Sequence, residues 1–206
     1  MKWILLPLLA SGLWAGDSGR LIYSKSFPGS VPAFTQITLE PSGNAEYCEA
    51  ENDDQPLKFK LTETDTHQVY ELVDKLDHFK RPLESGLKVA FMGTKTFRWQ
   101  EGDQKTEVKF NYSEDLSAQA LLDWFERMAE SAQRRMDLER TAKYDRLGVF
   151  KALALLSASM DHKRLVAVEQ YLPMLDRIAN NESYMHTARV RASEIAEAIR
   201  NPNPKP

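Results

Sequence analysis

The stretch FRWQEGDQKTEVKFNY, Phe97–Tyr112, decides the fold class of this 206-residue chain. On both sides of Gly102, apolar and polar residues alternate with a period of two, which is the pattern of a β-strand with one buried face. The segment Glu101-Gly102-Asp103 separates the two runs and predicts a tight turn, because glycine tolerates the positive φ that such turns need. The stretch therefore predicts an antiparallel hairpin whose buried face carries Phe97, Trp99, Val108, Phe110 and Tyr112.

Four runs that precede this hairpin predict further strands of the same sheet, at Leu21–Phe27, Phe34–Leu39, Ala45–Glu51 and Leu57–Leu61. One helix is expected at Thr64–Phe79, where apolar residues are spaced three and four apart, and Arg81-Pro82 ends it. The order predicts an α+β fold, with an antiparallel sheet of about five or six strands, one or two helices on one face, and an all-α helical region after it.

The chain becomes helical after Ser113. An apolar stripe that includes Trp124 and Phe125 is expected to dock on the sheet, on the face bearing Phe59, Phe97 or Phe110. The next tract, Glu130–Arg146, is highly charged and has few large apolar residues, so it predicts either an exposed helical extension or a connector. Further helices are expected at Val149–Met160, Leu165–Ile178 and Ser183–Ile199.

These patterns divide the chain after its first sixteen residues into three parts. Residues 17–130 are expected to form the α+β sheet domain, and residues 131–200 the helical region. Residues 201–206, NPNPKP, cannot continue a helix and are expected to be disordered.

The first sixteen residues, MKWILLPLLASGLWAG, predict a cleaved export signal. Lys2 gives a basic start, an apolar run follows, and small residues precede the polar Asp17. The apolar run is too short for a spanning helix, which needs about 20 residues. Cleavage is expected between Gly12 and Gly16, and the mature protein in the periplasm or outside the cell. The alternative interpretation is a buried N-terminal strand or helix.

Charge and cysteine content limit the classes of function. Removal of Lys2 with the signal makes the net charge of −3 one unit more negative, which gives no argument for a nucleic-acid partner. Cys48 is the only cysteine, so no disulfide can form within one chain. It lies in a predicted strand and is interpreted as a small hydrophobic residue of the core. The alternatives are an intermolecular disulfide and a reactive thiol.

The most ligand-like row of the sequence lies on the predicted helix Thr64–Phe79. His67, Glu71, Asp74 and His78 fall on one of its faces. His67 and His78 would lie about 16 Å apart along the axis and cannot share one ion. A structural zinc site needs four ligands, and the row is opposite the apolar stripe. It is therefore interpreted as solvated surface.

No catalytic, cofactor-binding or metal-binding residue is predicted, and no cofactor is expected. The sequence contains no G-x-S-x-G elbow, no H-E-x-x-H and no glycine-rich phosphate loop. Adjacent carboxylates such as Glu114-Asp115 are interpreted as helix-start charge rather than as a catalytic pair. Asn111 and Asn181 begin two glycan acceptor patterns, which matter only where the host glycosylates exported chains.

The last two predicted helices contain the pattern Tyr171-Leu172-Pro173-Met174-Leu175 with Ile178, and then Ala188-Arg189-Val190-Arg191-Ala192 with Ile195 and Ile199. Over about Tyr171–Ile199 this pattern resembles one unit of a HEAT-type helical repeat. Solenoids generally need three or more units and no second copy lies upstream, so an ordinary antiparallel helical hairpin also fits. The resemblance implies a protein-binding surface rather than catalysis.

One function and two alternatives follow from the sequence. We expect an exported, non-enzymatic protein that acts by protein–protein contact, without nucleic acid and without a membrane span once the signal is cleaved. The first alternative is an enzyme with a site at the sheet–helix junction, built from Tyr112, Glu114 or Asp115 with His67 or His78. The second is a small-ligand carrier with a closed apolar cavity. A deep pocket with convergent titratable groups would favour the enzyme, and a flat or grooved polar surface would favour binding.

Overall fold

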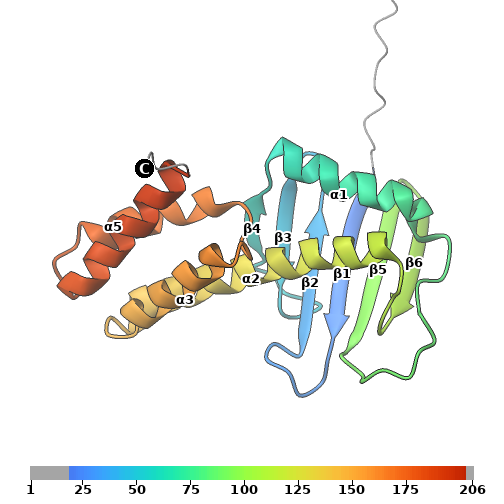
Figure 1. Cartoon of the computed structure of the whole chain (residues 1–206), viewed down its shortest axis with the longest axis horizontal. Helices are drawn as coiled ribbons and strands as arrows, with labels where there is room; N and C mark the ends of the chain where they lie inside the picture. Colours follow the sequence, from blue (N-terminus) through green and yellow to red (C-terminus); the bar gives the residue numbers. More distant parts are fainter. Residues whose placement is uncertain (1–18, 203–206) are drawn as a thin grey trace, which may run out of the picture.

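The structure, a computed structural model, describes residues 19–202. It contains a six-stranded antiparallel sheet with two helices on one face, followed by a helical region (Figure 1), which confirms the predicted α+β class. The strand order is β4-β3-β2-β1-β5-β6. The strands are β1 (Arg20–Ser26), β2 (Phe34–Leu39), β3 (Asn44–Cys48), β4 (Leu57–Lys60), β5 (Thr94–Glu101) and β6 (Gln104–Phe110). The predicted export signal, residues 1–16, and the end of the predicted tail, residues 203–206, lie outside the described residues.

The hairpin predicted around Gly102 is confirmed. β5 pairs with β6, with Phe97 opposite Val108, and Gly102 has a φ of +55°. Tyr112 lies two residues beyond the end of β6 and is 40% exposed, so its predicted place on the buried face is wrong. The ladder ends before it because the Glu84 carboxylate accepts the backbone N–H of Asn111.

The first helix, α1 (Glu63–Lys75), covers one half of the sheet face and ends earlier than the predicted Phe79. After Leu76 the chain forms a short 3-10 turn, η1 (Asp77–Phe79), in which all three residues have positive φ. This reversal places the buried Phe79 ring on the Phe97 ring, with centroids 5.3 Å apart. The contact of Phe79 with the sheet core therefore takes precedence over the helical periodicity of the sequence.

The second helix, α2 (Leu116–Tyr144), crosses the same face of the sheet and continues beyond its edge without a break (Figure 1). The Asp115 carboxylate caps its first turn by accepting the N–H groups of Ser117 and Ala118. Phe125 is fully buried on the sheet, as predicted, whereas Trp124 is only half-buried at the border of the core.

α2 contributes to two hydrophobic clusters in succession. The first cluster lies between the sheet and the two helices and includes α2 residues as far as Ala132. The second lies within the helical region and begins at Leu138. Leu138 and Ala142 are buried, so the charged tract Glu130–Arg146 is a packed connector and not an exposed extension.

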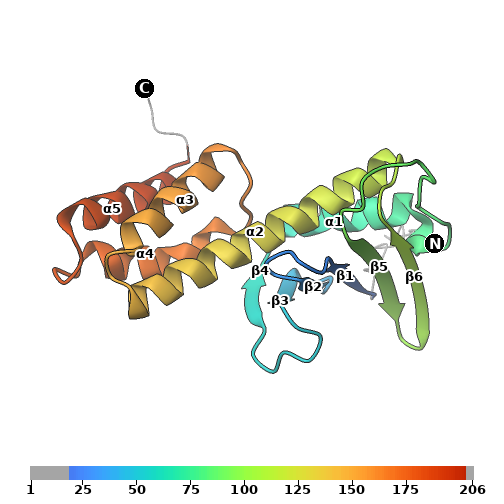
Figure 2. The same cartoon turned by 90° about the horizontal axis from the view of Figure 1, so that it is seen from below.

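The helical region contains α3 (Val149–Asp161), a 3-10 turn η2 (Val168–Tyr171), α4 (Leu172–Ala179) and α5 (His186–Arg200). The predicted helix Leu165–Ile178 is wrong at its start, because Val166 and Ala167 insert into the first cluster and Ala167 adopts a φ of 50°. The predicted start of the last helix at Ser183 is also wrong, since α5 begins at His186 after Met185. α4 and α5 lie side by side (Figure 2), an arrangement that fits both a single repeat unit and an ordinary hairpin.

None of the helices between residues 19 and 202 combines the length and the hydrophobicity that a bilayer span requires.

Candidate functional site

A polar groove lies where the sheet, α2 and the helical region meet. It has a volume of about 400 Å³ and is open to solvent. Its walls are the β1–β2 loop (residues 27–33), the side of α2 that faces this loop, and the α3–η2 connection. The charged side chains that line it are Lys25, Glu126, Glu130, Arg134 and Arg164.

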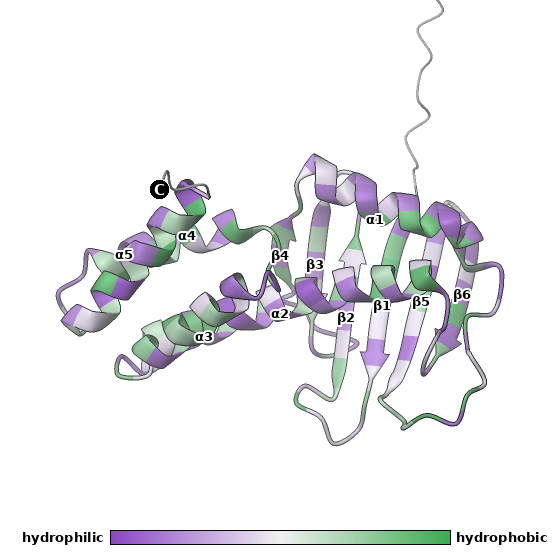
Figure 3. Cartoon of the chain, in the orientation of Figure 1, coloured by the Kyte–Doolittle hydropathy of each residue, from purple (hydrophilic) through white to green (hydrophobic). Residues whose placement is uncertain are grey.

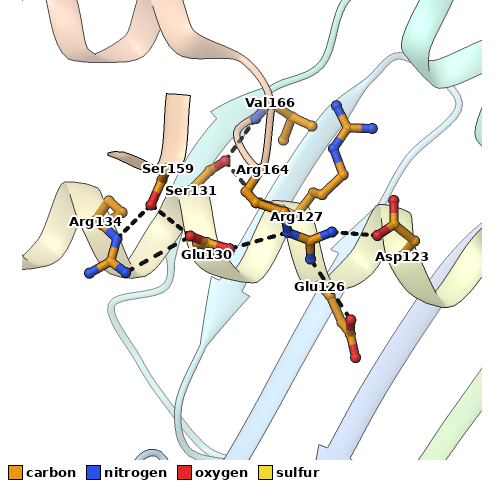
Figure 4. Close-up of polar contacts among 9 residues, drawn as sticks. All are labelled: Asp123, Glu126, Arg127, Glu130, Ser131, Arg134, Ser159, Arg164 and Val166. Carbon is orange, nitrogen blue, oxygen red and sulfur yellow. Dashed lines mark hydrogen bonds and ion pairs between the residues drawn. The ribbon is translucent and has the colours of Figure 1, made fainter. Parts of the chain in front are cut away.

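Arg164 is the centre of the charge pattern in this groove (Figure 4). Its guanidinium lies 2.5 Å from the carboxylate of Asp123, 3.8 Å from that of Glu126 and 3.4 Å from that of Glu130. These three acids follow one another at i, i+3 and i+7 on α2, so they form one stripe on the helix. One arginine of the α3–η2 connection therefore pairs with all three carboxylates of an acidic stripe on α2.

Ser159, at the end of α3, and Ser131, on α2, continue the network (Figure 4). The Ser159 hydroxyl donates to Glu130 at 2.6 Å and accepts from Arg134 Nε at 3.0 Å. The Ser131 hydroxyl is fully buried and accepts the backbone N–H of Val166 at 2.8 Å. These contacts hold the helical region on α2, and we refer to them together with Arg164 as the clasp.

Two titratable groups on the sheet face beneath α2 have pKa values that are shifted by burial. Burial, with the Glu126 carboxylate as a second cause, raises the pKa of the Tyr23 phenol, so the phenol stays neutral. On the same sheet face the Lys95 ammonium donates to the carbonyl of Asn111 at 2.6 Å, and burial lowers its pKa. The arginines of the clasp are paired with its carboxylates, which suits positioning and binding better than proton transfer.

The two histidines of the alternative enzyme site lie on α1 and at its end. His67 Nδ1 is 3.6 Å from the carboxylate of Glu71 on the exposed face of α1. His78 Nε2 is 3.3 Å from the carboxylate of Asp74, and its ring lies edge-on to Trp99 at 4.8 Å. The row therefore forms two separate pairs. The His67–Glu71 pair lies on the exposed face of α1, as expected for solvated surface, whereas His78 lies beyond the helix in η1 and its side chain is only 28% exposed.

The acidic residues of the alternative site have a structural environment of their own. Asp115 caps α2 and pairs with the Arg81 guanidinium at 2.5 Å, an interaction that lowers the pKa of its carboxyl. Glu114 and Tyr112 are exposed on the chain that leads into α2. None of the five residues of the alternative enzyme site lines the polar groove.

Cys48 ends β3 and is half-buried, with its thiol 3.8 Å from the carbonyl of Gln36. Burial raises the pKa of the thiol, and the carboxylates of Asp53 and Glu46 act in the same direction. A thiol that resists ionisation is a poor nucleophile, which agrees with the packing interpretation. Within residues 19–202 no group of three or more potential ligand side chains is arranged to hold a metal ion.

A second feature, which the sequence reasoning did not identify, is an exposed apolar surface near the groove. Two loops form it, the β1–β2 loop and the segment 80–93, of which Figure 3 colours the stretch just before β5 as hydrophobic. We call its exposed side chains the apolar tip. They are Val31 (100% exposed), Phe91 (57%), Met92 (54%), Leu87 (51%) and Val89 (44%).

The apolar tip is held in place by hydrogen bonds of the backbone beneath it. The Asn111 side chain accepts from the N–H of Met92 at 2.8 Å and donates to the carbonyl of Ala90 at 3.1 Å. The rings of Phe27 and Phe91 meet edge to face at 6.0 Å and join the two loops.

Weak signals of both features were present in the sequence. Asp123, Glu126 and Glu130 share a predicted helix face, which is the pattern of an acidic stripe that needs a cation. The segment GLKVAFMG, 86–93, is an apolar run between two glycines. Nothing in the sequence indicates that Arg164 reaches the stripe, or that the run stays at the surface.

No protein-family model matches the chain, and no curated protein matches its sequence.

Proposed function

We propose that this chain is an exported, non-enzymatic protein that acts by protein–protein contact. The observation that carries the proposal is the apolar tip, in which five large apolar side chains from two loops are at least 44% exposed. Exposed apolar surface of this kind is a feature of sites that bind other molecules. The hydrogen bonds of Asn111 fix the backbone under the tip, so that binding would cost little ordering entropy.

The two alternatives receive less support. The groove between the sheet, α2 and the helical region is open, and its two arginines are paired with carboxylates, which fits a binding surface. The space in which a carrier would hold a ligand is occupied by aromatic rings. Tyr23, Phe97, Phe110 and Phe125 fill the layer between the sheet and α2 with mutual ring contacts.

Site-specific photo-crosslinking tests the proposal. A benzophenone amino acid is placed at Phe91 in the full chain, which is expressed in its native host, and adducts are identified by mass spectrometry. The matched control places the same group at Leu147, a 75% exposed apolar residue of the α2–α3 turn. We expect a discrete protein adduct at position 91 and none at position 147. Equal adducts at both positions, or none at position 91, would contradict the proposal.

The export component has its own test. The mass of the protein recovered from the envelope and from the medium reports whether residues 1–16 have been removed. A chain recovered outside the cytoplasm with an intact N-terminus would contradict cleavage, and a chain retained in the cytoplasm would contradict export.

A further inference from the structure

Three loops meet at one end of the sheet. β1 and β3 both run antiparallel to β2, so the β1–β2 loop and the β3–β4 loop (residues 49–56) leave the sheet at the same end. β5 runs antiparallel to β1, so the segment 80–93 enters the sheet there as well. Figure 2 looks onto this end, with the β1–β2 loop between the other two. We refer to the three loops together as the loop end.

The β3–β4 loop carries a concentrated negative charge beside the apolar tip. Residues 49–56, EAENDDQP, contain four acidic residues and neither lysine nor arginine. All four, Glu49, Glu51, Asp53 and Asp54, are exposed. The repulsion among these like charges decreases when a partner of opposite charge approaches.

The apolar tip itself contributes little charge. Its segment contains Lys80 and Arg81, which pair with Asp77 and Asp115. It also contains Lys88, which is exposed, and Glu84, whose carboxylate accepts the backbone N–H of Asn111 and of Ser85. The loop end therefore combines a nearly neutral apolar half with an acidic half. A surface that matches both halves has an apolar part flanked on one side by cations.

We propose that the loop end docks a partner protein whose contact surface joins an apolar hollow to a border of lysine or arginine side chains. This inference rests on the proposed function and adds to it the extent of the surface and the chemistry of the partner. The convex tip needs a concave apolar counterpart. The β3–β4 loop then lies against the basic border.

The same charges argue against a lipid surface as the occupant. Anionic headgroups attract basic segments, whereas the loop end presents four carboxylates at the level where headgroups would lie. Insertion of the apolar tip into an anionic bilayer would bring these carboxylates against like charge.

Crosslinking from two positions of the full chain tests the partner chemistry. The benzophenone group is placed at Phe91 in one variant and at Asp54 in another, with Val190 on α5 as the control position. We expect the same partner to be attached at positions 91 and 54. The partner's peptide attached at position 54 should contain lysine or arginine. Thermal unfolding of each variant confirms that it is folded, since all three positions are exposed.

A charge variant gives the second measurement. Replacement of Glu51→Gln, Asp53→Asn and Asp54→Asn together should lower the adduct yield at position 91 about tenfold at low salt, and less at high salt. The matched control is Glu169→Gln, Glu182→Gln and Glu194→Gln on the exposed surface of the helical region, which should leave the yield unchanged.

The outcomes separate this inference from the proposed function. Adducts at position 91 but not at position 54, or a partner peptide at position 54 that is acidic, would overturn the partner chemistry and leave protein contact intact. Absence of adducts at both positions would overturn both. Co-sedimentation of the purified chain with phosphatidylcholine vesicles containing phosphatidylglycerol, abolished by Phe91→Ser, would overturn the inference in favour of a lipid surface.

Discussion

The ring of Phe125 on α2 stacks on the ring of Tyr23 on β1, with centroids 4.8 Å apart and planes inclined by 16°. Phe125 is fully buried, and its ring also lies 5.9 Å from that of Phe97 on the neighbouring strand. This pair joins the long helix to the centre of the sheet. Offset stacking of this kind adds to the free energy that burial of the rings contributes.

Phe125→Ala should therefore destabilise the fold by about 3–5 kcal/mol, the usual range for truncation of a buried phenylalanine. Trp124→Ala is the matched variant on the next position of the helix. It should cost less, because Trp124 is half-buried and one of its ring faces stacks with the Arg127 guanidinium at 4.5 Å. Urea unfolding followed by circular dichroism measures both values. Equal losses for the two variants would contradict the docking geometry of α2.

Ser131→Ala removes the acceptor of the Val166 N–H in the clasp. A buried donor left without a partner costs about 1–3 kcal/mol. Ser193→Ala on α5 is the control, because it gains the same helix propensity at an exposed position. Hydrogen exchange should show faster exchange at the Val166 amide in Ser131→Ala alone. Unchanged protection of that amide would show that the hydrogen bond does not form in solution.

Arg164→Gln removes the cation that contacts all three carboxylates of the acidic stripe, and leaves only Arg134 beside Glu130. Its partners are partly exposed, so the free energy of unfolding should fall by only about 0–1 kcal/mol. Salt should reduce this difference, because it screens the repulsion among the three carboxylates. Arg177→Gln on the exposed side of α4 is the control. A loss that does not change between low and high salt would argue that Arg164 acts through packing rather than charge.

Asp115 predicts a dependence of stability on acid pH. The Arg81 guanidinium is the main cause that lowers the pKa of this carboxyl in the folded state. The ionised carboxyl therefore contributes its full stabilisation at a pH above its pKa in the unfolded chain, which is about 3.9. This stabilisation is lost as the pH falls through the lower pKa of the folded state. Asp115→Asn keeps a capping oxygen but no charge, so it should lower Tm by about 2–4 °C at pH 7 and leave it unchanged near pH 2. A Tm difference that persists at pH 2 would point to a lost cap instead.

Limited proteolysis with trypsin should cut first at Arg146. This residue lies in the exposed turn between α2 and α3. Arg134 and Arg135 should resist, because they lie within α2 and are hydrogen-bonded to Ser159 and Glu139. Early cleavage after Arg134 or Arg135 would mean that the centre of α2 opens readily, as the charge of its sequence alone suggests.

The sequence predicts the parts of this fold that depend on local pattern. The alternation around Gly102 is sufficient for the hairpin, because the period of a strand and the φ of its turn are properties of neighbouring residues. It does not predict where Phe79 and Val166 go. Both leave helical geometry to reach the core of the sheet, and such contacts join residues far apart in the chain.

The candidate surfaces are harder to predict from the sequence, because they too depend on contacts between residues far apart in the chain. The acidic stripe of α2 can be recognised from its spacing, but its cation, Arg164, comes 34 residues after Glu130. The run from Leu87 to Met92 has the composition of a buried strand, and only the hydrogen bonds of Asn111 show that it forms an exposed loop. Composition indicates whether a segment is apolar, whereas its exposure depends on the rest of the fold.

Because α2 belongs to both hydrophobic cores, the gene cannot be divided within this helix into two parts that each encode a complete core. The same helix covers the sheet with its first half and forms one wall of the helical region with its second. A recombination breakpoint placed inside Leu116–Tyr144 would deprive one core or the other of a wall. Insertions and fusions are therefore compatible with chain positions before Leu116 or after Tyr144, but not with positions within the helix. The sheet and the helical region must be inherited together.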